Sequence, residues 1–334
     1  MSPHHPSETP DSPCDPPPDW WLFHGDNRAR TPAMPPAPPW RSFGRTPDGA
    51  PAGRYLIDRT ETDIVNAALH LRRPLLVTGH PGTGKSSLAH AIAHELSLGE
   101  VLHWPVNSRS TLQDALYRYD AIGRLRESTL LRESALPHER ARAEPDIGSF
   151  VRLGPLGTAL VPAERPRVLL VDELDKGDVD LPNDLLTAFE EGAFEIPELA
   201  RLPEAEAEVD VLTADGGGRR TRVVRGRIRC TEFPVVVITS NGERDFPPAF
   251  LRRCLRLDLP DPDETRLRSI VAAHLGPEAL DGAEDVLRTF LERRAEGELA
   301  TDQLLNAVFL RKGGIGLDAG ELLDAVLRRL GGAV

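Results

Sequence analysis

Short apolar runs alternate with helical patterns through the middle of the chain. We predict five strands, at Pro74–Gly79, Val101–Val106, Arg167–Val171, Val235–Thr239 and Leu255–Leu259. Three of these runs are almost wholly apolar, which is typical of strands covered on both faces. Helical patterns at Lys85–Leu98 and Pro182–Glu191 separate several of them. This alternation predicts an α/β fold with a five-stranded parallel sheet and right-handed crossovers.

Helical periodicity also flanks this region on both sides. An amphipathic helix is expected at Thr62–Arg72, before the first strand. After Pro262 the strand patterns stop, and four helices are expected, at Glu264–Leu275, Ala283–Arg294, Asp302–Leu310 and Ala319–Leu330. We therefore expect an α/β domain over residues 53–261 and a small all-α lid domain over residues 262–334.

Three segments of the α/β domain lie outside its strands and main helices. Glu127–Pro145 is rich in Arg and Glu and is interpreted as a solvated helix or loop. Within residues 196–232, Val209–Leu212 and Thr221–Ile228 are predicted to pair as a hairpin across a glycine turn. Residues 107–111 follow the second strand and either cap a helix, through Ser110 or Thr111, or face a ring pore.

Residues 1–52 differ in composition from the rest and hold 14 of the 31 prolines. Proline lacks an amide donor and disfavours helix before it, so we expect a mostly disordered or polyproline-like arm. Three of the four tryptophans, Trp20, Trp21 and Trp40, lie here. The cluster at residues 20–23 either packs back on its own chain or serves as a docking peptide for a partner or a neighbouring subunit.

The charge balance narrows the classes of function. With 40 Lys and Arg against 52 Asp and Glu, the net charge is −12, which argues against a general nucleic-acid binder. No run of 18 apolar residues and no apolar signal segment is present, so we expect a cytoplasmic protein without a membrane partner. Cys14, Cys230 and Cys254 lack metal-ligand spacing. His80 and His103 are interpreted as local features, because no ligand cluster surrounds either in the sequence.

A glycine-rich loop joins the first predicted strand to a helix. It fits the pattern G-x-x-x-x-G-K-[ST], and its residues are Gly79, His80, Pro81, Gly82, Thr83, Gly84, Lys85 and Ser86. The glycines let backbone amides turn toward phosphate oxygens, and the helix N-terminus adds positive potential. Lys85 can reach the β- and γ-phosphates and Ser86 can ligate Mg²⁺. With Ser87, these residues are the predicted nucleotide-binding set, and ATP and Mg²⁺ are the predicted cofactors.

Polar residues also end two other predicted strands. Asp172 and Glu173 follow one apolar strand, and Asn241 follows another. Asp172 is placed to hold Mg²⁺ through water, and Glu173 to polarise an attacking water. Asn241 can bond that water or the γ-phosphate, although Ser240-Asn241-Gly242 also suits a simple turn. The adjacent acids favour hydrolysis over phosphoryl transfer to a substrate hydroxyl.

Two arginines, Arg252 and Arg253, precede the last predicted strand. Guanidinium groups stabilise charge on a transferring phosphoryl group, and when supplied by a neighbouring molecule they couple subunits. Ordinary surface ion pairing, which contributes little to stability, is the alternative role for this pair.

The order of these four elements resembles that of AAA+ ATPases, and the details are similar to their MoxR-like branch. The resemblance spans Tyr55 to Leu330 and includes residues 172–176 (DELDK), 181–186 (LPNDLL) and 189–192 (FEEG). It implies a helical lid, nucleotide bound between the two domains, and a ring, commonly a hexamer. It further implies that residues 79–86 are Walker A, Asp172 and Glu173 Walker B, Asn241 sensor 1 and Arg253 the arginine finger, with Arg252 as its rival. Residues 196–232 would be the hairpin insert of that branch.

The chain departs from the family at the start of the third lid helix. A basic sensor 2 residue is common there, but residues 297–303 read GELATDQ, without Arg or Lys. Either Arg293 or Arg294 takes its place, or the lid senses the nucleotide weakly.

The preferred functional prediction is a MoxR-like AAA+ ATPase that remodels a partner protein. The resemblance implies a client with a von Willebrand factor type A domain. A slow ATP-dependent assembly switch that signals through the N-terminal arm is a second hypothesis. A nucleic-acid motor is a third, which the acidic charge does not favour.

Overall fold

The computed structural model describes residues 20–23, 28–41, 55–134, 144–297, 299–317 and 321–328. Within these ranges no helix is both long and apolar enough to cross a membrane. Cys14 and the start of the predicted helix Ala319–Leu330 lie outside them.

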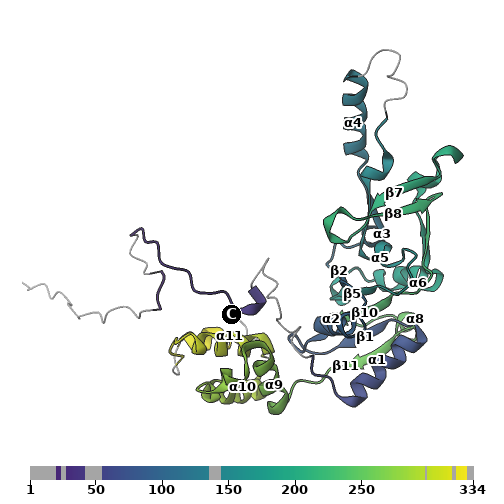
Figure 1. The fold of residues 1–334 in the computed structure, drawn as a ribbon. Coiled ribbons are helices and arrows are strands. Elements are labelled where there is room, and N and C mark those ends of the chain that lie inside the picture. The colour runs from purple at the N-terminus through teal and green to yellow at the C-terminus, as the bar shows by residue number, and fades with distance from the viewer. Residues whose placement is uncertain are drawn as a thin grey trace, which may run out of the picture.

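The central sheet confirms the prediction of five parallel strands (Figure 1). Its spatial order is β11-β1-β10-β5-β2. The strands are β1 (Leu75–Thr78), β2 (Leu102–Pro105), β5 (Val168–Asp172), β10 (Val235–Ser240) and β11 (Leu255–Asp258). Because all five run the same way, the polar residues at their carboxyl ends meet at one edge of the sheet.

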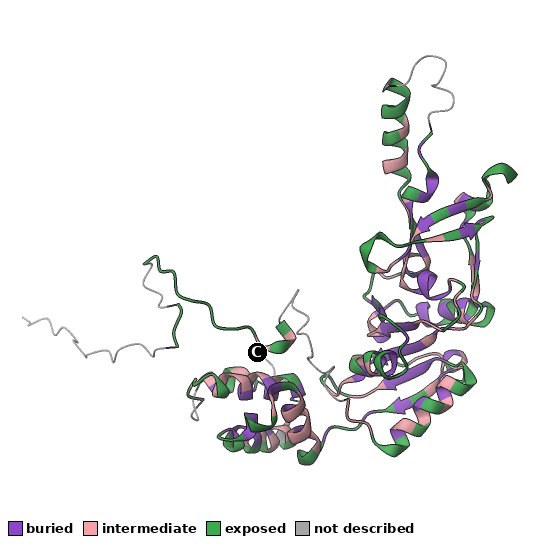
Figure 2. Ribbon diagram, in the orientation of Figure 1, coloured by how far each residue is buried: buried purple, intermediate pink, exposed green. Residues whose placement is uncertain are grey.

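Hydrophobic cores cover both faces of this sheet. Successive side chains of a strand point to opposite faces, so Leu75 and Val77 pack in one cluster and Leu76 packs in the other. Figure 2 shows the buried strands between exposed outer surfaces. Helices on the two faces and beyond the edge include α1 (Arg59–Leu71), α2 (Lys85–Glu95), α6 (Leu181–Glu191) and α8 (Pro248–Leu251).

Local end signals explain where the main helices begin and end. Helix α1 begins three residues before the predicted start because Asp58 and Glu61 form a reciprocal capping box. Helix α2 ends at Glu95, before a left-handed residue at Ser97. Helix α6 ends at Glu191 and is capped by Gly192, whose φ of 57° suits a residue without a side chain.

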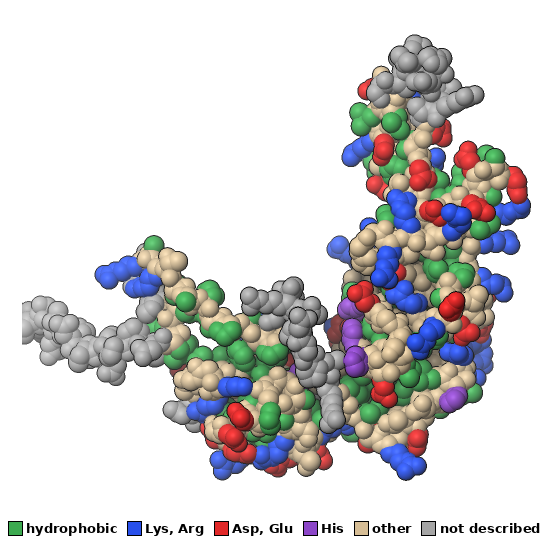
Figure 3. All heavy atoms as spheres, viewed as in Figure 1, with side chains coloured by type: hydrophobic (Ala, Val, Ile, Leu, Met, Phe, Trp, Pro, Cys, Tyr) green, Lys and Arg blue, Asp and Glu red, His purple; other side chains and the backbone are tan. Residues whose placement is uncertain are grey.

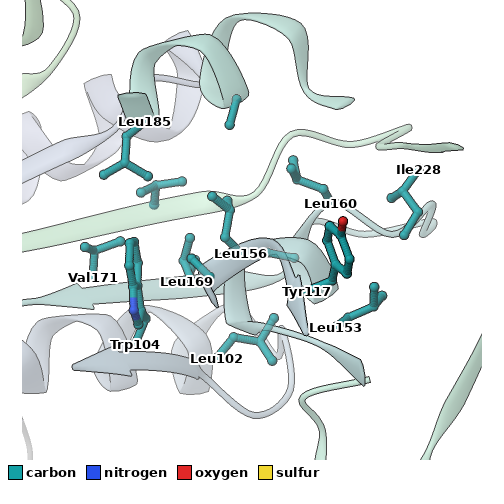
Figure 4. Packing of buried hydrophobic residues seen from close by; sticks show 14 of the residues in the cluster. Leu102, Trp104, Tyr117, Leu153, Leu156, Leu160, Leu169, Val171, Leu185 and Ile228 are labelled. Atoms are coloured by element: carbon teal, nitrogen blue, oxygen red, sulfur yellow. The ribbon is translucent and has the colours of Figure 1, made fainter. Parts of the chain in front are cut away.

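A second, six-stranded sheet packs on the α/β body, and of it only the hairpin was predicted. Its order is β3-β4-β7-β8-β9-β6. The strands are β3 (Tyr117–Tyr119), β4 (Val151–Leu153), β6 (Ala193–Glu195), β7 (Glu208–Leu212), β8 (Arg220–Val224) and β9 (Arg227–Arg229). Figure 4 shows Leu156 and Leu160 lying between Leu169 of the central sheet and Tyr117 of the second, so one core serves both sheets.

The hairpin prediction was wrong in one detail. Residues 221–228, expected as one strand, are split between β8 and β9 by a turn at Arg225 and Gly226. Both residues have positive φ, of 53° and 67°, which breaks the extended backbone.

Further helices lie in the connections between the strands of the two sheets. They are α3 (Leu112–Leu116), α4 (Ala121–Ser134), α5 (Pro155–Ala159) and α7 (Pro197–Ala200), with 3₁₀ turns at Leu174–Lys176, Ile147–Phe150, Glu204–Glu206 and Gly216–Gly218. Thr111 caps α3 by accepting the Asp114 amide, which confirms the capping alternative for this segment. Helix α4 projects from the body (Figure 1) and covers the first part of the predicted charged insertion. Residues 135–143 of that insertion lie outside the described part.

The region after residue 262 is helical. It contains α9 (Glu264–Leu275), α10 (Glu284–Glu296), α11 (Thr301–Lys312) and α12 (Glu321–Val326), with a 3₁₀ turn at Pro277–Leu280. Its own core is centred on fully buried residues such as Phe290, Leu267 and Leu304. We call this region the lid.

The N-terminal arm reaches the lid through one aromatic contact. Trp40, in a 3₁₀ turn at Pro39–Arg41, packs edge-on against Phe309 of α11, with ring centres 5.9 Å apart. Residues 20–23 do not behave in the same way, because Phe23 is 85% exposed and Trp20 and Trp21 are each 41% exposed. Residues 20–23 are therefore exposed in the described structure, and their packing on the chain or docking to a partner stays a prediction, whereas Trp40 packs on the lid.

A buried ion pair joins the lid to the body. Arg266 on α9 donates to the Glu61 carboxylate of α1 at 3.0 and 3.3 Å and to the Leu56 carbonyl at 2.8 Å. Only 5% of the Glu61 side chain is exposed. Removing one partner of such a pair leaves the other charge buried and uncompensated.

We expect Arg266→Met to lower the free energy of unfolding by about 3 kcal/mol, measured by urea denaturation. Arg268→Met is the matched control, because Arg268 lies two residues along α9 and pairs with Glu264 and Glu284 at the surface. Its loss should change stability little. Equal unfolding curves for the two variants would show that the Arg266–Glu61 pair does not hold the lid.

Candidate functional site

The glycine-rich loop lies where β1 ends and α2 begins. Helix α2 starts at Lys85, directly after Gly84, whose φ of 90° places it in left-handed space. The Lys85 ammonium donates to the carbonyls of Gly79 at 2.6 Å and His80 at 2.8 Å. Burial lowers the pKa of Lys85, and the charges of Asp175, Asp172 and Glu173 act against that decrease. The loop therefore encloses a positive charge beside the amino end of a helix.

Asp172 is the hub of a polar cluster at the end of β5. One carboxylate oxygen accepts from Ser86 at 2.7 Å and from Thr239 at 2.6 Å, and the other contacts His103 at 3.2 Å. Burial raises the pKa of Asp172, but these three hydrogen bonds outweigh burial and hold the pKa below its ordinary 3.8. Ser86 and Asp172 thus present two adjacent hard oxygen donors, which are the ligands that Mg²⁺ prefers.

Glu173 is held by its backbone and by its side chain. Its φ of 58° and ψ of 50° are left-handed, which is uncommon for a residue with a side chain. Its amide donates to Thr239 Oγ1 at 2.8 Å. Its carboxylate forms an ion pair with the Lys176 ammonium at 2.8 Å and accepts a hydrogen bond from the side-chain amide of Asn241 at 3.3 Å. Asn241 and Glu173 therefore face the same small region.

These side chains border an open cleft of about 1060 Å³ between the body and the lid. The loop residues from Pro81 to Ser87, with Asp172, Glu173 and Asn241, line its body side. From the lid, Arg266, His274 and Thr301 line it. Figure 3 shows a hollow in this position, with histidine side chains on the body side.

The lid touches the glycine-rich loop directly. A side chain at Gly82 would lie 2.8 Å from the Thr301 amide nitrogen and 3.2 Å from Ala300 Cβ. The lid therefore contacts the glycine-rich loop through Ala300 and Thr301, which belong to residues 297–303, the segment that contains no Arg or Lys. Arg293 pairs with Asp324 and Arg294 bonds to the Pro262 carbonyl, so both expected substitutes are engaged elsewhere.

His80 and the two arginines before β11 lie away from this cluster. His80 pairs with Asp261 at 2.9 Å. Arg253 is paired with Glu190 of α6 and donates to the Ala249 carbonyl at 3.1 Å. Arg252 is exposed. Neither arginine lines the cleft of its own chain.

The family model for the AAA domain (dynein-related subfamily) matches residues 74–254. The chain belongs to this family. No curated protein matches it. Among solved structures, NtrX from Brucella abortus in complex with ADP is 15% identical, over 80% of this chain and 53% of that one, with a TM-score of 0.36. The same protein in complex with ATP is 14% identical, over 72% and 52%, with a TM-score of 0.33. The chain spans about half the length of these structures.

Several residues of the AAA site had no individual sequence signal. Thr239 and Asp175 lie inside or beside recognised motifs but were not singled out, and Arg266 is one of 37 arginines. Tyr55 packs near Gly84 and its hydroxyl is buried without a hydrogen-bond partner. Burial, reinforced by the Glu61 charge, raises the pKa of Tyr55 to about 12. His103 was interpreted as a local feature, and its contact with Asp172 became visible only from the pairing of β2 with β5.

Thr239→Val should lower the free energy of unfolding by about 2 kcal/mol, because it leaves the Glu173 amide buried without an acceptor. The variant also removes one donor to Asp172. The low pKa of Asp172 stabilises the fold above pH 3.8, and this contribution is lost as the pH falls through the folded-state value. The difference in the free energy of unfolding between Thr239→Val and wild type, measured by urea denaturation, should therefore become smaller at acid pH but should not reach zero.

Thr289→Val is the control for this substitution, because its hydroxyl makes a single bond to the Asp285 carbonyl on the lid surface. A pH-independent difference for Thr239→Val would contradict the assigned bond to Asp172.

Proposed function

We propose that this AAA domain binds ATP with Mg²⁺ in the cleft and hydrolyses it. The observation that carries the proposal is the convergence of Lys85, Ser86, Asp172, Glu173 and Asn241 at one sheet edge, beside a helix N-terminus. A buried cation, oxygen donors for a metal ion and a carboxylate beside a side-chain amide are the groups that phosphoanhydride hydrolysis requires.

Each group has a role that its surroundings support. Lys85, now bound to two loop carbonyls, would turn to the β- and γ-phosphates. Ser86 and Asp172 would hold Mg²⁺, which neutralises phosphate charge when bound. Glu173 would accept a proton from the attacking water, and Asn241 would orient that water. The backbone amides of residues 79–86 would bind phosphate oxygens.

We further propose that the site is completed by a neighbouring copy in a ring, as in MoxR-like ATPases. Arg253 or Arg252 would supply the finger, because both lie outside the cleft of their own chain. On this proposal the ring, a hexamer, remodels or activates a cytoplasmic protein client, with a von Willebrand factor type A domain as the candidate. The Arg253–Glu190 pair must open for Arg253 to act.

The alternative of a slow assembly switch has one observation in its favour. Trp40 ties the arm to α11, whose first turn contacts the glycine-rich loop. Nucleotide could therefore alter the position of the arm. The acidic charge continues to argue against a nucleic-acid motor.

Glu173→Gln should lower the rate of ATP hydrolysis by about 100-fold or more while ATP affinity is retained, because only the proton acceptor is lost. Lys85→Ala should abolish binding itself. Phosphate release and fluorescent-nucleotide titration measure the two effects. Glu191→Gln, at the exposed end of α6, is the matched control and should behave as wild type.

Full activity in Glu173→Gln would reject its assigned role. No ATP binding by the wild type would reject the proposed function altogether. Binding with very slow turnover at every protein concentration would favour the switch.

Arg253→Ala should reduce hydrolysis by about 1000-fold if its guanidinium acts across a subunit interface. Specific activity of the wild type should then rise with protein concentration. Mixing Arg253→Ala with Glu173→Gln should restore some turnover, since a Glu173→Gln subunit supplies an intact Arg253 to the intact Glu173 site of an Arg253→Ala neighbour. Arg256→Ala, an exposed arginine on β11, is the control.

A loss in Arg252→Ala alone would assign the finger to that residue. Normal activity in both variants, together with activity independent of concentration, would contradict the shared site.

A further inference from the structure

We propose that Asp175 is a positioning residue for hydrolysis. It holds the turn after β10 so that the side-chain amide of Asn241 meets the Glu173 carboxylate. The proposal rests on the proposed function, because it concerns the same site. It adds a residue that touches neither nucleotide nor metal and acts through Asn241.

Asp175 lies in the turn that follows Glu173, at Leu174–Lys176, and is only 3% exposed. Its Oδ2 accepts two backbone hydrogen bonds from the turn after β10, from the Asn241 amide at 2.9 Å and the Glu243 amide at 3.1 Å. Its Oδ1 is buried without a hydrogen-bond partner. Within the described ranges no ion pair to this carboxylate is present, so the two amides are its main compensation.

The two turns that carry the reacting side chains are therefore fastened to each other. Asp175, in the turn after β5, accepts hydrogen bonds from the turn after β10. Arg244, which follows the turn after β10, donates to the Gly177 carbonyl beside the turn after β5, at 2.9 Å. Gly242, with φ of 78°, lets the chain reverse between the two amides that Asp175 binds. Because the Asn241 backbone is fixed by this contact, its side chain has a defined origin from which to reach Glu173 Oε1 at 3.3 Å.

The chemistry of the side chain at position 175 separates two kinds of substitution. An apolar residue would leave two backbone amides unpaired, whereas asparagine could keep its oxygen toward the amides and its nitrogen at the unpartnered position. The arrangement thus predicts opposite behaviour for alanine and asparagine.

The first test is a kinetic cycle with Asp175→Ala, Asn241→Ala and the double variant. Asp175→Ala should lower kcat by the same factor as Asn241→Ala, about tenfold or more, with ATP affinity unchanged. The double variant should fall no lower than Asn241→Ala alone, because both changes remove one function. Asp175→Asn should keep kcat within about threefold of the wild-type value. A threefold change in kcat corresponds to less than about 1 kcal/mol of activation free energy. Asp178→Ala is the matched control, since its exposed carboxylate also accepts a backbone amide nearby, from Asp180.

The second test does not depend on hydrolysis. Hydrogen exchange on the full chain without nucleotide should show protected Asn241 and Glu243 amides in wild type and Asp175→Asn, and loss of that protection in Asp175→Ala. Retained protection in Asp175→Ala, or multiplicative effects on kcat in the cycle, would overturn the proposal. If Asp175→Ala does not fold, Asp175→Ser replaces it in both tests. Loss of amide protection or a lower kcat in a folded Asp175→Asn also overturns the proposal. If the wild type protects both amides but has no ATPase activity, the proposed function is rejected, whereas the contact of Asp175 with the two amides still stands.

Discussion

The hydrogen bond between Thr239 and Asp172 is the contact on which the site depends. It joins the ends of two adjacent parallel strands, and the same Thr239 oxygen accepts the Glu173 amide. Thr239 is 1% exposed, so water cannot substitute for either partner. The carboxylate of Asp172 and the left-handed backbone of Glu173 are therefore fixed by one hydroxyl, and Ser86 of the glycine-rich loop is fixed to them in turn.

Around this contact, negative charges outnumber positive ones within a small volume. Lys85 brings one positive charge, and Asp172, Glu173 and Asp175 bring three negative charges that oppose the effect of burial on its pKa. Under the proposed function, a bound divalent cation would offset this excess of negative charge. Lys176, paired with Glu173 at 2.8 Å, supplies part of the compensation.

The lid contacts both the α/β body and the N-terminal arm. Arg266 holds α9 to the start of α1, and the first residues of α11 lie against Gly82. The same α11 carries Phe309, on which Trp40 of the arm packs. A change at the loop thus has a short packed route to the arm, although the lid has no basic residue at its contact with the loop.

Local pattern alone determined the five central strands, two of the helices between them (α2 and α6) and the glycine-rich loop, because apolar runs and turn residues are signals within a few positions. It also identified Asp172, Glu173 and Asn241 as strand-end polar residues that would meet at one edge. Apart from its hairpin, the second sheet escaped prediction, because four of its strands are only three residues long and show no periodicity. The contacts of Thr239, Asp175, His103 and Arg266 join residues from 66 to 210 positions apart, so only the tertiary structure could decide them.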